Sequence, residues 1–245
     1  GIAEGLRRLP GRPMGIMGDD SHRIDQSGGL NPDSAGVEPA PILIRRCQDN
    51  VIRLHILMFG GGPAIRAKTY RVFHKHNTQV VLDEIVNWAT EGVTQLGCSP
   101  CTLAVGVGRS HFEATSMMLQ AQVDGRYDFQ SEMEQEITRR VNEANIGPLG
   151  LHGKTSVIAT FMKVGPQRAS GVRIVCVRPT CCFEPRLNLS NKGIYLLFYV
   201  FNSHGVNHGS TYRRYAYRYN AKKERGTSME VFARNENHKG AMMNV

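Results

Sequence analysis

CSPCTLAVGVGRSHFE, residues 98–113, contains the clearest change from strand to helix in the chain. Residues 102–105 are apolar or small and lead into a glycine turn, which predicts a short buried strand. Ser110 is a favourable helix N-cap and Glu113 completes a capping box, so we expect a helix through about residue 123. This local order is typical of mixed α/β proteins.

Two further helices and several strands are predicted on either side of this segment. Residues 78–96 carry apolar side chains at helical spacing, and Ser131 with Glu134 forms a second capping box for a helix that ends near Asn145. The remaining apolar runs predict strands at 41–44, 54–59, 156–164, 172–177 and 194–201. Together these elements predict a mixed α/β fold of mixed β-sheets with flanking helices.

The composition is that of an ordinary globular protein. The chain has 245 residues and a mass of 27.2 kDa, with 41% hydrophobic and 21% charged residues, which suits one domain or two small ones. No apolar run of about 18 residues is present, and the first residues lack the apolar core of a signal peptide. We therefore expect no membrane span and a cytoplasmic location.

The positive charge is concentrated near the C-terminus. Residues 187–245 hold nine Lys and Arg against three Glu, a net +6 of the total +9. Aromatic and basic residues alternate between Tyr212 and Tyr219, a pattern that also occurs where proteins stack on nucleic-acid bases. We favour an edge strand with a solvated basic face, so nucleic acid is not an expected partner.

Six cysteines suggest metal or redox chemistry rather than disulfides, because no secretion signal is evident. Cys98 and Cys101 have the Cys-x-x-Cys spacing of zinc and redox sites, but no second such pair exists. On its own, Cys98 is equally well explained as a small buried hydrophobic residue, and Cys182 as a thiol at a strand end. The adjacent residues Cys181 and Cys182 are a poor disulfide pair.

The sequence NIGPLGLHGKT, residues 145–155, ends like a phosphate-binding loop. Such a loop needs a glycine five residues before the Gly-Lys-Thr triplet, and Pro148 stands there without an amide hydrogen. The preceding segment is also predicted to be a helix, where a strand is required. A nucleotide site is therefore not expected.

Several short motifs in a fixed order resemble the iron–sulfur hydro-lyase family of class I fumarases and L(+)-tartrate dehydratase alpha subunits. They are the triple glycine at 60–62, Cys-Ser-Pro at 98–100 before a Gly-Val-Gly turn, the loop at 145–155, and Cys182 four residues before Arg186. The resemblance covers about residues 39–186. It implies an iron–sulfur hydro-lyase alpha-type domain at 39–186. Turn-forming residues without an amphipathic period predict a poorly organised segment at 1–38, and residues 187–245, which do not resemble the family, form a basic C-terminal extension of unknown role.

The chain departs from the family pattern at individual positions. Ser99 replaces a proline, and His152 replaces a glycine in the loop. Around the triple glycine, Phe59 replaces a lysine, Pro63 a serine and Ile65 an asparagine, and a triple glycine is also found in ordinary flexible turns. These changes put the polar side chains of the glycine loop in doubt more than its backbone.

The resemblance implies a [4Fe–4S] cluster held by Cys98, Cys182 and a third cysteine. Cys47 lies in Cys-Gln-Asp, which matches the first three residues of the family's first ligand motif. In that alignment Asp49 corresponds to a residue considered an acid/base group. An alternative alignment places Cys47 in a strand and leaves the first ligand outside this sequence.

The same resemblance suggests how a small dicarboxylate would be bound. Arg186 and Lys154 suit substrate carboxylates or the surroundings of the cluster, and Lys154 is also a candidate catalytic residue; a structural role explains both equally well. Gly61 and Gly62 belong to the glycine loop, and Arg7 corresponds to the family's substrate-binding Leu-Arg pair. Other family groups come from a beta subunit or domain, so a partner and an oligomer are implied. The sequence predicts reversible hydration of fumarate or dehydration of malate or tartrate, without distinguishing these substrates. The alternative is a non-catalytic structural or assembly subunit that kept the fold but lost the cluster.

Overall fold

The computed structural model of the chain shows a mixed α/β protein, which confirms the predicted fold class. It divides into two compact units, Gly1–Arg46 and Cys47–Val245, and each is described by itself. The described residues are 2–8, 15–36, 43–46, 53–57, 61–181, 186–190, 194–200, 213–219 and 230–234.

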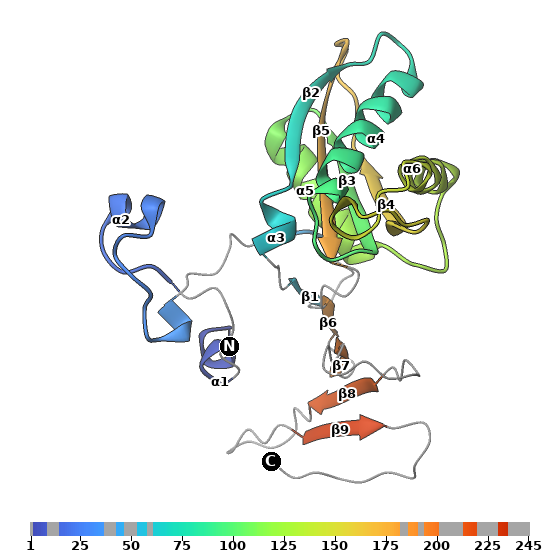
Figure 1. Cartoon of the computed structure of the whole chain (residues 1–245). Coiled ribbons are helices and arrows are strands. Elements are labelled where there is room, and N and C mark those ends of the chain that lie inside the picture. The colour runs from blue at the N-terminus through green and yellow to red at the C-terminus, as the bar shows by residue number, and fades with distance from the viewer. Residues whose placement is uncertain are drawn as a thin grey trace. The chain divides into compact units, whose positions relative to one another are not determined.

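A four-stranded sheet with the strand order β2-β5-β3-β4 is the largest sheet among the described strands of the second unit (Figure 1). Its strands are β2 (Lys68–Phe73), β3 (Cys101–Gly108), β4 (Val157–Val164) and β5 (Val172–Cys181). β3 and β4 are parallel, whereas β5 runs antiparallel to both β3 and β2. Strands β2, β3 and β4 therefore begin at the end of the sheet where β5 finishes, and we call this the cysteine end.

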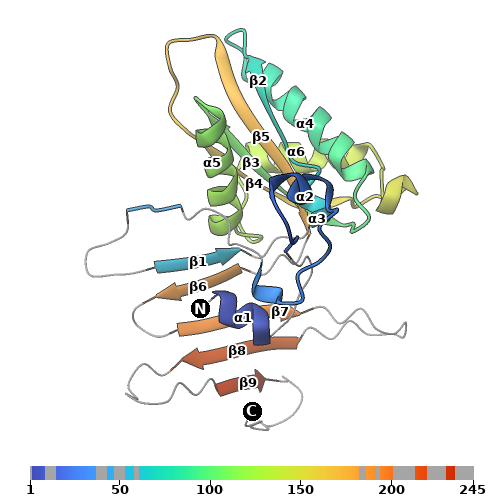
Figure 2. The ribbon, with the colours of Figure 1, turned by 90° about the vertical axis from the view of Figure 1, so that its left-hand side faces the viewer.

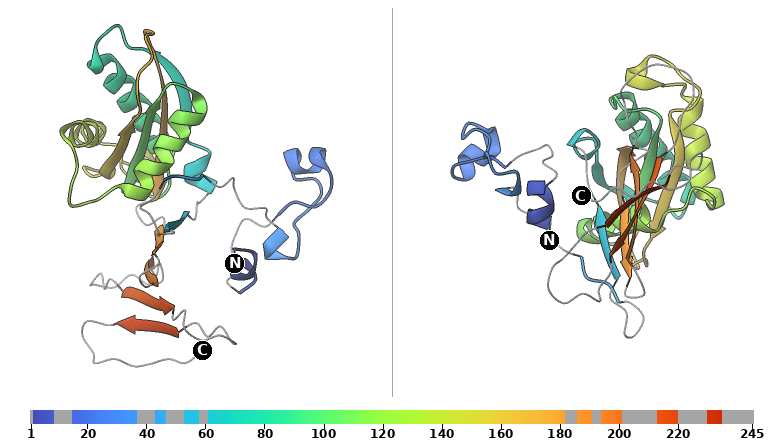
Figure 3. Two further views of the ribbon diagram at one scale, coloured as in Figure 1. Left: turned by 180° about the vertical axis from the view of Figure 1, so that it is seen from behind. Right: turned by 90° about the horizontal axis from the view of Figure 1, so that it is seen from below.

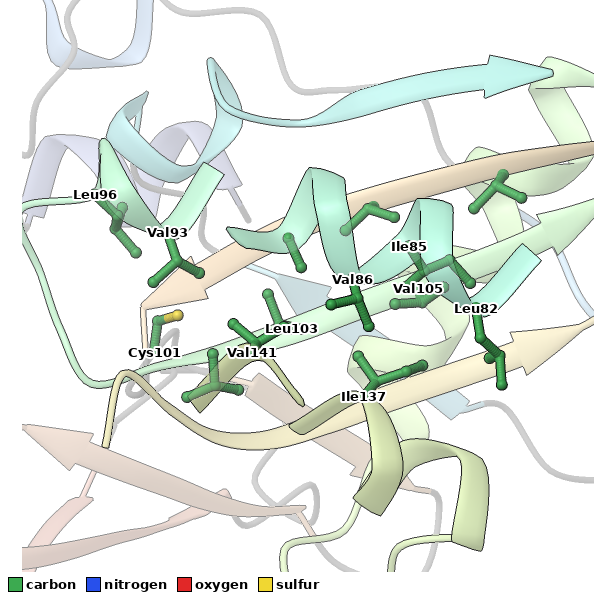
Figure 4. Close-up of a cluster of buried hydrophobic side chains, with 14 of the residues drawn as sticks. Leu82, Ile85, Val86, Val93, Leu96, Cys101, Leu103, Val105, Ile137 and Val141 are labelled. Carbon is green, nitrogen blue, oxygen red and sulfur yellow. The ribbon is translucent and has the colours of Figure 1, made fainter. Parts of the chain in front are cut away.

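Helices cover both faces of this sheet (Figures 2 and 3). One face carries α4 (Thr78–Thr94) and α6 (Glu132–Glu143), and the other carries α5 (His111–Asp124). Every residue of β3 is buried, as expected for a central strand covered on both sides. In the core under α4 and α6, Ile85 and Ile137 pack over Leu103 and Val105 (Figure 4).

The predicted helices are confirmed, with one change at a cap. The second capping box is complete, because Ser131 and Glu134 exchange hydrogen bonds at the start of α6. Ser110 caps α5 by accepting a hydrogen bond from the Glu113 amide. The reciprocal bond differs from the prediction, since the Glu113 carboxylate accepts from the amide and guanidinium of Arg109.

The predicted glycine turn after residue 105 is wrong, because β3 continues through Gly108. The glycines here allow α5 to lie against the strand. A Cβ on Gly106 would be 2.0 Å from the Ala114 carbonyl oxygen and 2.3 Å from the Met118 nitrogen. Helix backbone fills the space that these glycines leave open.

The strand predictions at 156–164, 172–177 and 194–201 are confirmed, and β5 is longer than expected. The strand at 54–59 is confirmed over the described residues of β1 (Arg53–Leu57). A strand at 41–44 is wrong for its described part, because residues 43–46 have no regular structure and Ile44 is 93% exposed.

Two smaller sheets complete the second unit. β1 pairs with β6 (Arg186–Ser190), and the other sheet has the order β7-β8-β9. These three strands are β7 (Ile194–Val200), β8 (Arg213–Tyr219) and β9 (Glu230–Arg234). The basic and aromatic tract is therefore a central strand, and the expectation of an edge strand is wrong.

The described residues of the first unit form short helical elements and turns. The helical elements are α1 (Ile2–Arg8), α2 (Asp20–Asp25) and the 3-10 helix η1 (Ser34–Gly36). Asp19 caps α2, which explains how so short a helix begins without an apolar face. Among the described helices of the whole chain, none is long and apolar enough to cross a membrane.

Candidate functional site

The cysteine end of the four-stranded sheet brings together the motifs that the sequence spreads over more than a hundred residues. The short helix α3 (Gly61–Ala64) precedes β2, and the Cys98 turn precedes β3. The loop at 145–156 precedes β4, and Cys181 ends β5. The strand directions alone therefore place these segments at one end of the four-stranded sheet.

The two cysteines of the Cys-x-x-Cys sequence have different environments. Cys98 is exposed in the turn before β3, whereas Cys101 is buried in the core beside α4. The alternative that Cys98 is a small buried hydrophobic residue is therefore wrong, and Cys101 has that role. Cys101 pairs directly across the sheet with Cys181, so the Cys98 turn and the end of β5 are neighbours.

The Cys98 turn is attached to the loop before β4. The Ser99 hydroxyl donates a hydrogen bond of 3.3 Å to the Ser156 carbonyl oxygen, and the Cys101 amide donates to the same oxygen at 2.9 Å. A Cβ built on Gly97 would lie 3.5 Å from Leu149 Cδ2, in ordinary contact with the tip of that loop. These contacts fix the exposed thiol relative to the loop that carries Lys154.

One asparagine anchors the base of the loop. Asn142 Oδ1 accepts hydrogen bonds from the amides of Ser156 and Val157 at 2.8 and 2.9 Å, and its Nδ2 donates to the Val157 carbonyl at 2.8 Å. The Ser156 hydroxyl then accepts from the Gly147 amide at 2.9 Å. Both ends of the loop are thus held by polar side chains.

The loop has a strained backbone. Asn145, Leu149 and His152 have φ values of 51°, 53° and 70°, in the left-handed region that L residues avoid. Only glycine fits at position 147, because a Cβ there would lie 2.1 Å from the His152 carbonyl oxygen. Strain of this kind costs about 1–3 kcal/mol per residue and is concentrated at functional sites in proteins.

The surface of the loop combines one cation with apolar side chains. Lys154 is exposed and has no acidic partner in the part of the chain that the structure describes. Leu149 and Leu151 are 64% and 75% exposed. Helix α6 precedes the loop and β4 follows it, which agrees with the rejection of a phosphate-binding loop.

The glycines of α3 are open to solvent, and an arginine lies next to them. A Cβ on Gly61 would meet no atom within 4 Å, so a small ligand has room beside this backbone. Arg66 donates a hydrogen bond of 2.7 Å to the Gly62 carbonyl, while its buried Nε–H has no partner among the described residues. Sequence reasoning did not consider Arg66, although it follows the triple glycine by only four residues.

Another cysteine of the sheet is unsuited to bind metal. Cys176 is buried in β5 under α5, and burial raises the pKa of its thiol. A raised pKa disfavours the thiolate, which is the form that ligates metals. This separates Cys176 from the exposed Cys98.

The remaining predicted site residues are only partly described. Cys47, Asp49 and Cys182 lie outside the described residues. Arg186 begins β6, whose backbone alone is described. Arg7 lies in the first unit, where its guanidinium forms an ion pair of 3.0 Å with Asp33. Among the described residues, no three His, Cys, Asp or Glu side chains are grouped as a metal site.

Comparison with known proteins gives one family. A family model described as fumarate hydratase (Fumerase) matches residues 1–189, which is more than half of the chain. No curated protein matches the sequence.

Proposed function

Because the chain belongs to the fumarate hydratase (Fumerase) family, we propose that it is a hydro-lyase subunit that adds water to, or removes water from, a small dicarboxylate. The proposed substrates are the pair fumarate and malate or, alternatively, tartrate. The matched segment, residues 1–189, contains all the motifs on which the resemblance rests.

The observation that carries the proposal is the convergence at the cysteine end. Four segments from different parts of the chain meet there: the open glycines of α3, the exposed Cys98, the strained loop with Lys154, and the end of β5. The hydrophobic core does not depend on these features, since it lies between the sheet and the helices. An exposed thiol in a turn bound to the loop of Lys154, a cation with no acidic partner among the described residues, is instead suited to binding.

Of the three proposed ligands only Cys98 is among the described residues, and its exposed thiol is compatible with the [4Fe–4S] cluster that the family implies. Cys98 is exposed and lies beside the end of β5, from which Cys182 follows by one residue. We propose Cys98 and Cys182 as two ligands and Cys47 as the third. When bound, such a cluster with three protein ligands offers one open iron as a Lewis acid for a hydroxyl and a carboxylate.

The chain's own residues then bind and orient the substrate. Lys154 supplies an ammonium group for one carboxylate, and Arg66 and Arg186 supply guanidinium groups that suit bidentate binding. Gly61 and Gly62 let the backbone approach closely. Asp49 is proposed to transfer the proton at the carbon next to the one that carries the hydroxyl.

We also propose that a beta subunit or domain completes the site. Leu149, Leu151 and Ile65 are large apolar side chains exposed at the cysteine end. Apolar side chains that surround a polar site are typical of surfaces covered by another protein. We propose further that such paired halves form an oligomer.

Anaerobic reconstitution tests the proposal. The chain is incubated with iron and sulfide, and iron content, sulfur-to-iron charge-transfer absorption and turnover of fumarate and L(+)-tartrate are measured. Cys98→Ser is expected to lose most of the bound iron, whereas the control Cys176→Ala keeps it, because Cys176 is buried under α5. Equal iron in wild type and Cys98→Ser would contradict the assignment of this ligand. Full folding and assembly without iron or turnover would favour a non-catalytic subunit.

A further inference from the structure

The two edge strands of the four-stranded sheet, β4 and β2, differ in whether side chains bind their outward backbone groups. At the β4 edge, side chains bind the outward backbone groups. Gln130 accepts a hydrogen bond from the Thr160 amide at 3.1 Å, and Glu134 accepts from the Met162 amide at 2.7 Å. Asn142 binds both the amide and the carbonyl of Val157. These side chains occupy the positions that a further strand would need.

The β2 edge is open within the described residues. β2 pairs with β5 alone, and the His74 amide donates at 3.0 Å to the carbonyl of Gly171, the residue before β5. Backbone groups alternate along an antiparallel strand, so those of Thr69, Arg71 and Phe73 point away from β5. No side chain among the described residues caps them, in contrast to the β4 edge.

The open edge is positively charged and partly aromatic. Lys68, Arg71 and Lys75 lie on or directly after β2, and of these only Lys68 has an acidic partner among the described residues, Glu91 at 3.1 Å. The Arg71 guanidinium lies 5.8 Å from the centre of the Phe73 ring, and Phe73 is 57% exposed. A strand that docks here meets net positive charge and an accessible ring.

We propose that the β2 edge binds an extended acidic segment of a partner protein, which adds to the sheet as a further strand. Main-chain hydrogen bonds to Thr69, Arg71 and Phe73 would provide affinity, and carboxylates opposite Arg71 and Lys75 would provide selectivity. A second copy of β2 is disfavoured, because antiparallel pairing of two such strands brings their cations together. Phe73 and Lys75 lie where β2 finishes, so this part of the surface is at the opposite end of the strand from the cysteine end.

An acidic peptide of about eight residues, the length of a short strand, tests the proposal with the full chain. The peptide alternates Glu with Thr and Val, and its binding is followed by fluorescence anisotropy. Residue-resolved hydrogen exchange then measures the protection of each backbone amide. The amides of Thr69, Arg71 and Phe73 should gain protection on binding, while those of Tyr70 and Val72 are already protected by β5. Binding without this alternating protection would overturn the proposal.

Charge variants test selectivity. Arg71→Glu should weaken binding of the acidic peptide by about tenfold or more, since an attractive cross-strand pair becomes repulsive. The matched control is Arg126→Glu, an exposed arginine between α5 and α6, which should bind as the wild type does. Equal binding of a neutral peptide with the same pattern would overturn the acidic partner. Protection of the same amides that rises with protein concentration, without peptide, would replace the partner with a second copy.

Discussion

Ser99 and Ser156 lie in separate loops at the cysteine end, and the hydroxyl of Ser99 donates a hydrogen bond to the carbonyl of Ser156. The same carbonyl accepts the Cys101 amide as β3 begins. One peptide group therefore holds the turn of the exposed cysteine against the loop that carries Lys154. The position of that thiol depends on the polar anchors of the loop as much as on the sheet.

The first prediction concerns the anchor Asn142. Replacing it in Asn142→Ala removes three hydrogen bonds and leaves backbone groups of Ser156 and Val157 unpaired. Unpaired buried groups cost about 1–3 kcal/mol each, partly offset by water, so we expect a loss of about 2–3 kcal/mol in the free energy of unfolding. Urea denaturation measures it. Asn87→Ala, at an exposed position of α4, is the control and should change the free energy by less than about 0.5 kcal/mol. Equal effects of the two variants would contradict the anchoring role.

The second prediction tests the close packing of α5 on β3. Gly106→Ala places a methyl group against the backbone of Ala114 and Met118, which cannot move without shifting the helix. We expect a loss of about 3 kcal/mol or more, at the upper end of overpacking costs. Thermal unfolding followed by circular dichroism measures the change.

Gly171→Ala is the matched control for this substitution, since a Cβ at Gly171 meets nothing within 4 Å. Its free energy of unfolding should change by less than about 1 kcal/mol. If Gly106→Ala were as stable as this control, the tight contact between strand and helix would be disproved.

The third prediction is a pH dependence at the start of α5. Hydrogen bonds from the Arg109 side chain and amide lower the pKa of Glu113 from its ordinary 4.5 to about 2. The folded state thus binds this proton less readily than the unfolded state, so the stabilisation is complete above about pH 4.5 and is lost as the pH falls towards 2. Because the Arg109 side chain is 43% exposed, water screens the pair, and about 1 kcal/mol is expected.

Glu113→Gln removes this titration. Its stability should fall below that of the wild type at pH 7, and the difference should shrink steadily between about pH 4.5 and pH 2. Urea midpoints measured across this range give the comparison. A difference between the two proteins that stays constant from pH 7 to pH 2 would rule out the Arg109 pair as its cause.

The fourth prediction concerns Lys154. Lys154→Met should raise the KM for the dicarboxylate by about ten- to a hundredfold with unchanged iron content, because a charge-assisted hydrogen bond is worth about 1.5–3 kcal/mol. Steady-state kinetics of the reconstituted holoenzyme measure this. Lys75→Met is the control, since Lys75 follows the opposite end of β2 and its loss should leave KM unchanged. An unaltered KM in Lys154→Met would remove this residue from the substrate site.

Much of the central fold was predictable because local signals and packing agree. The apolar spacing of α4 and the capping box of Ser131 with Glu134 gave helices that the core also requires. The glycines at the end of β3 misled prediction, since residues that permit a turn also permit a helix to approach a strand. That distinction depends on how α5, which begins at His111 only three residues after β3, folds back onto the strand, and the local pattern does not show this.

The site was predictable as a set of segments but not as a geometry. Cys98 and Lys154 stand out by their motifs, yet only strand direction shows that they share one end of the sheet. Arg66 was missed because the burial of its Nε–H, which has no partner in the described part of the chain, leaves no trace in the sequence pattern. The roles of Cys98 and Cys101 could not be separated either, since burial alone distinguishes two thiols three residues apart.

The side chains of Gln130 and Glu134 along β4 have a consequence for solubility. A sheet that can grow from only one side accepts a single guest strand, because side chains on the opposite edge already bind the amides of Val157, Thr160 and Met162. Fibrils require both sides to be available in every molecule. Gln130 and Glu134 therefore oppose polymerisation. Without them, backbone groups on both edge strands would be free to pair, and successive molecules could add to one another through their sheets.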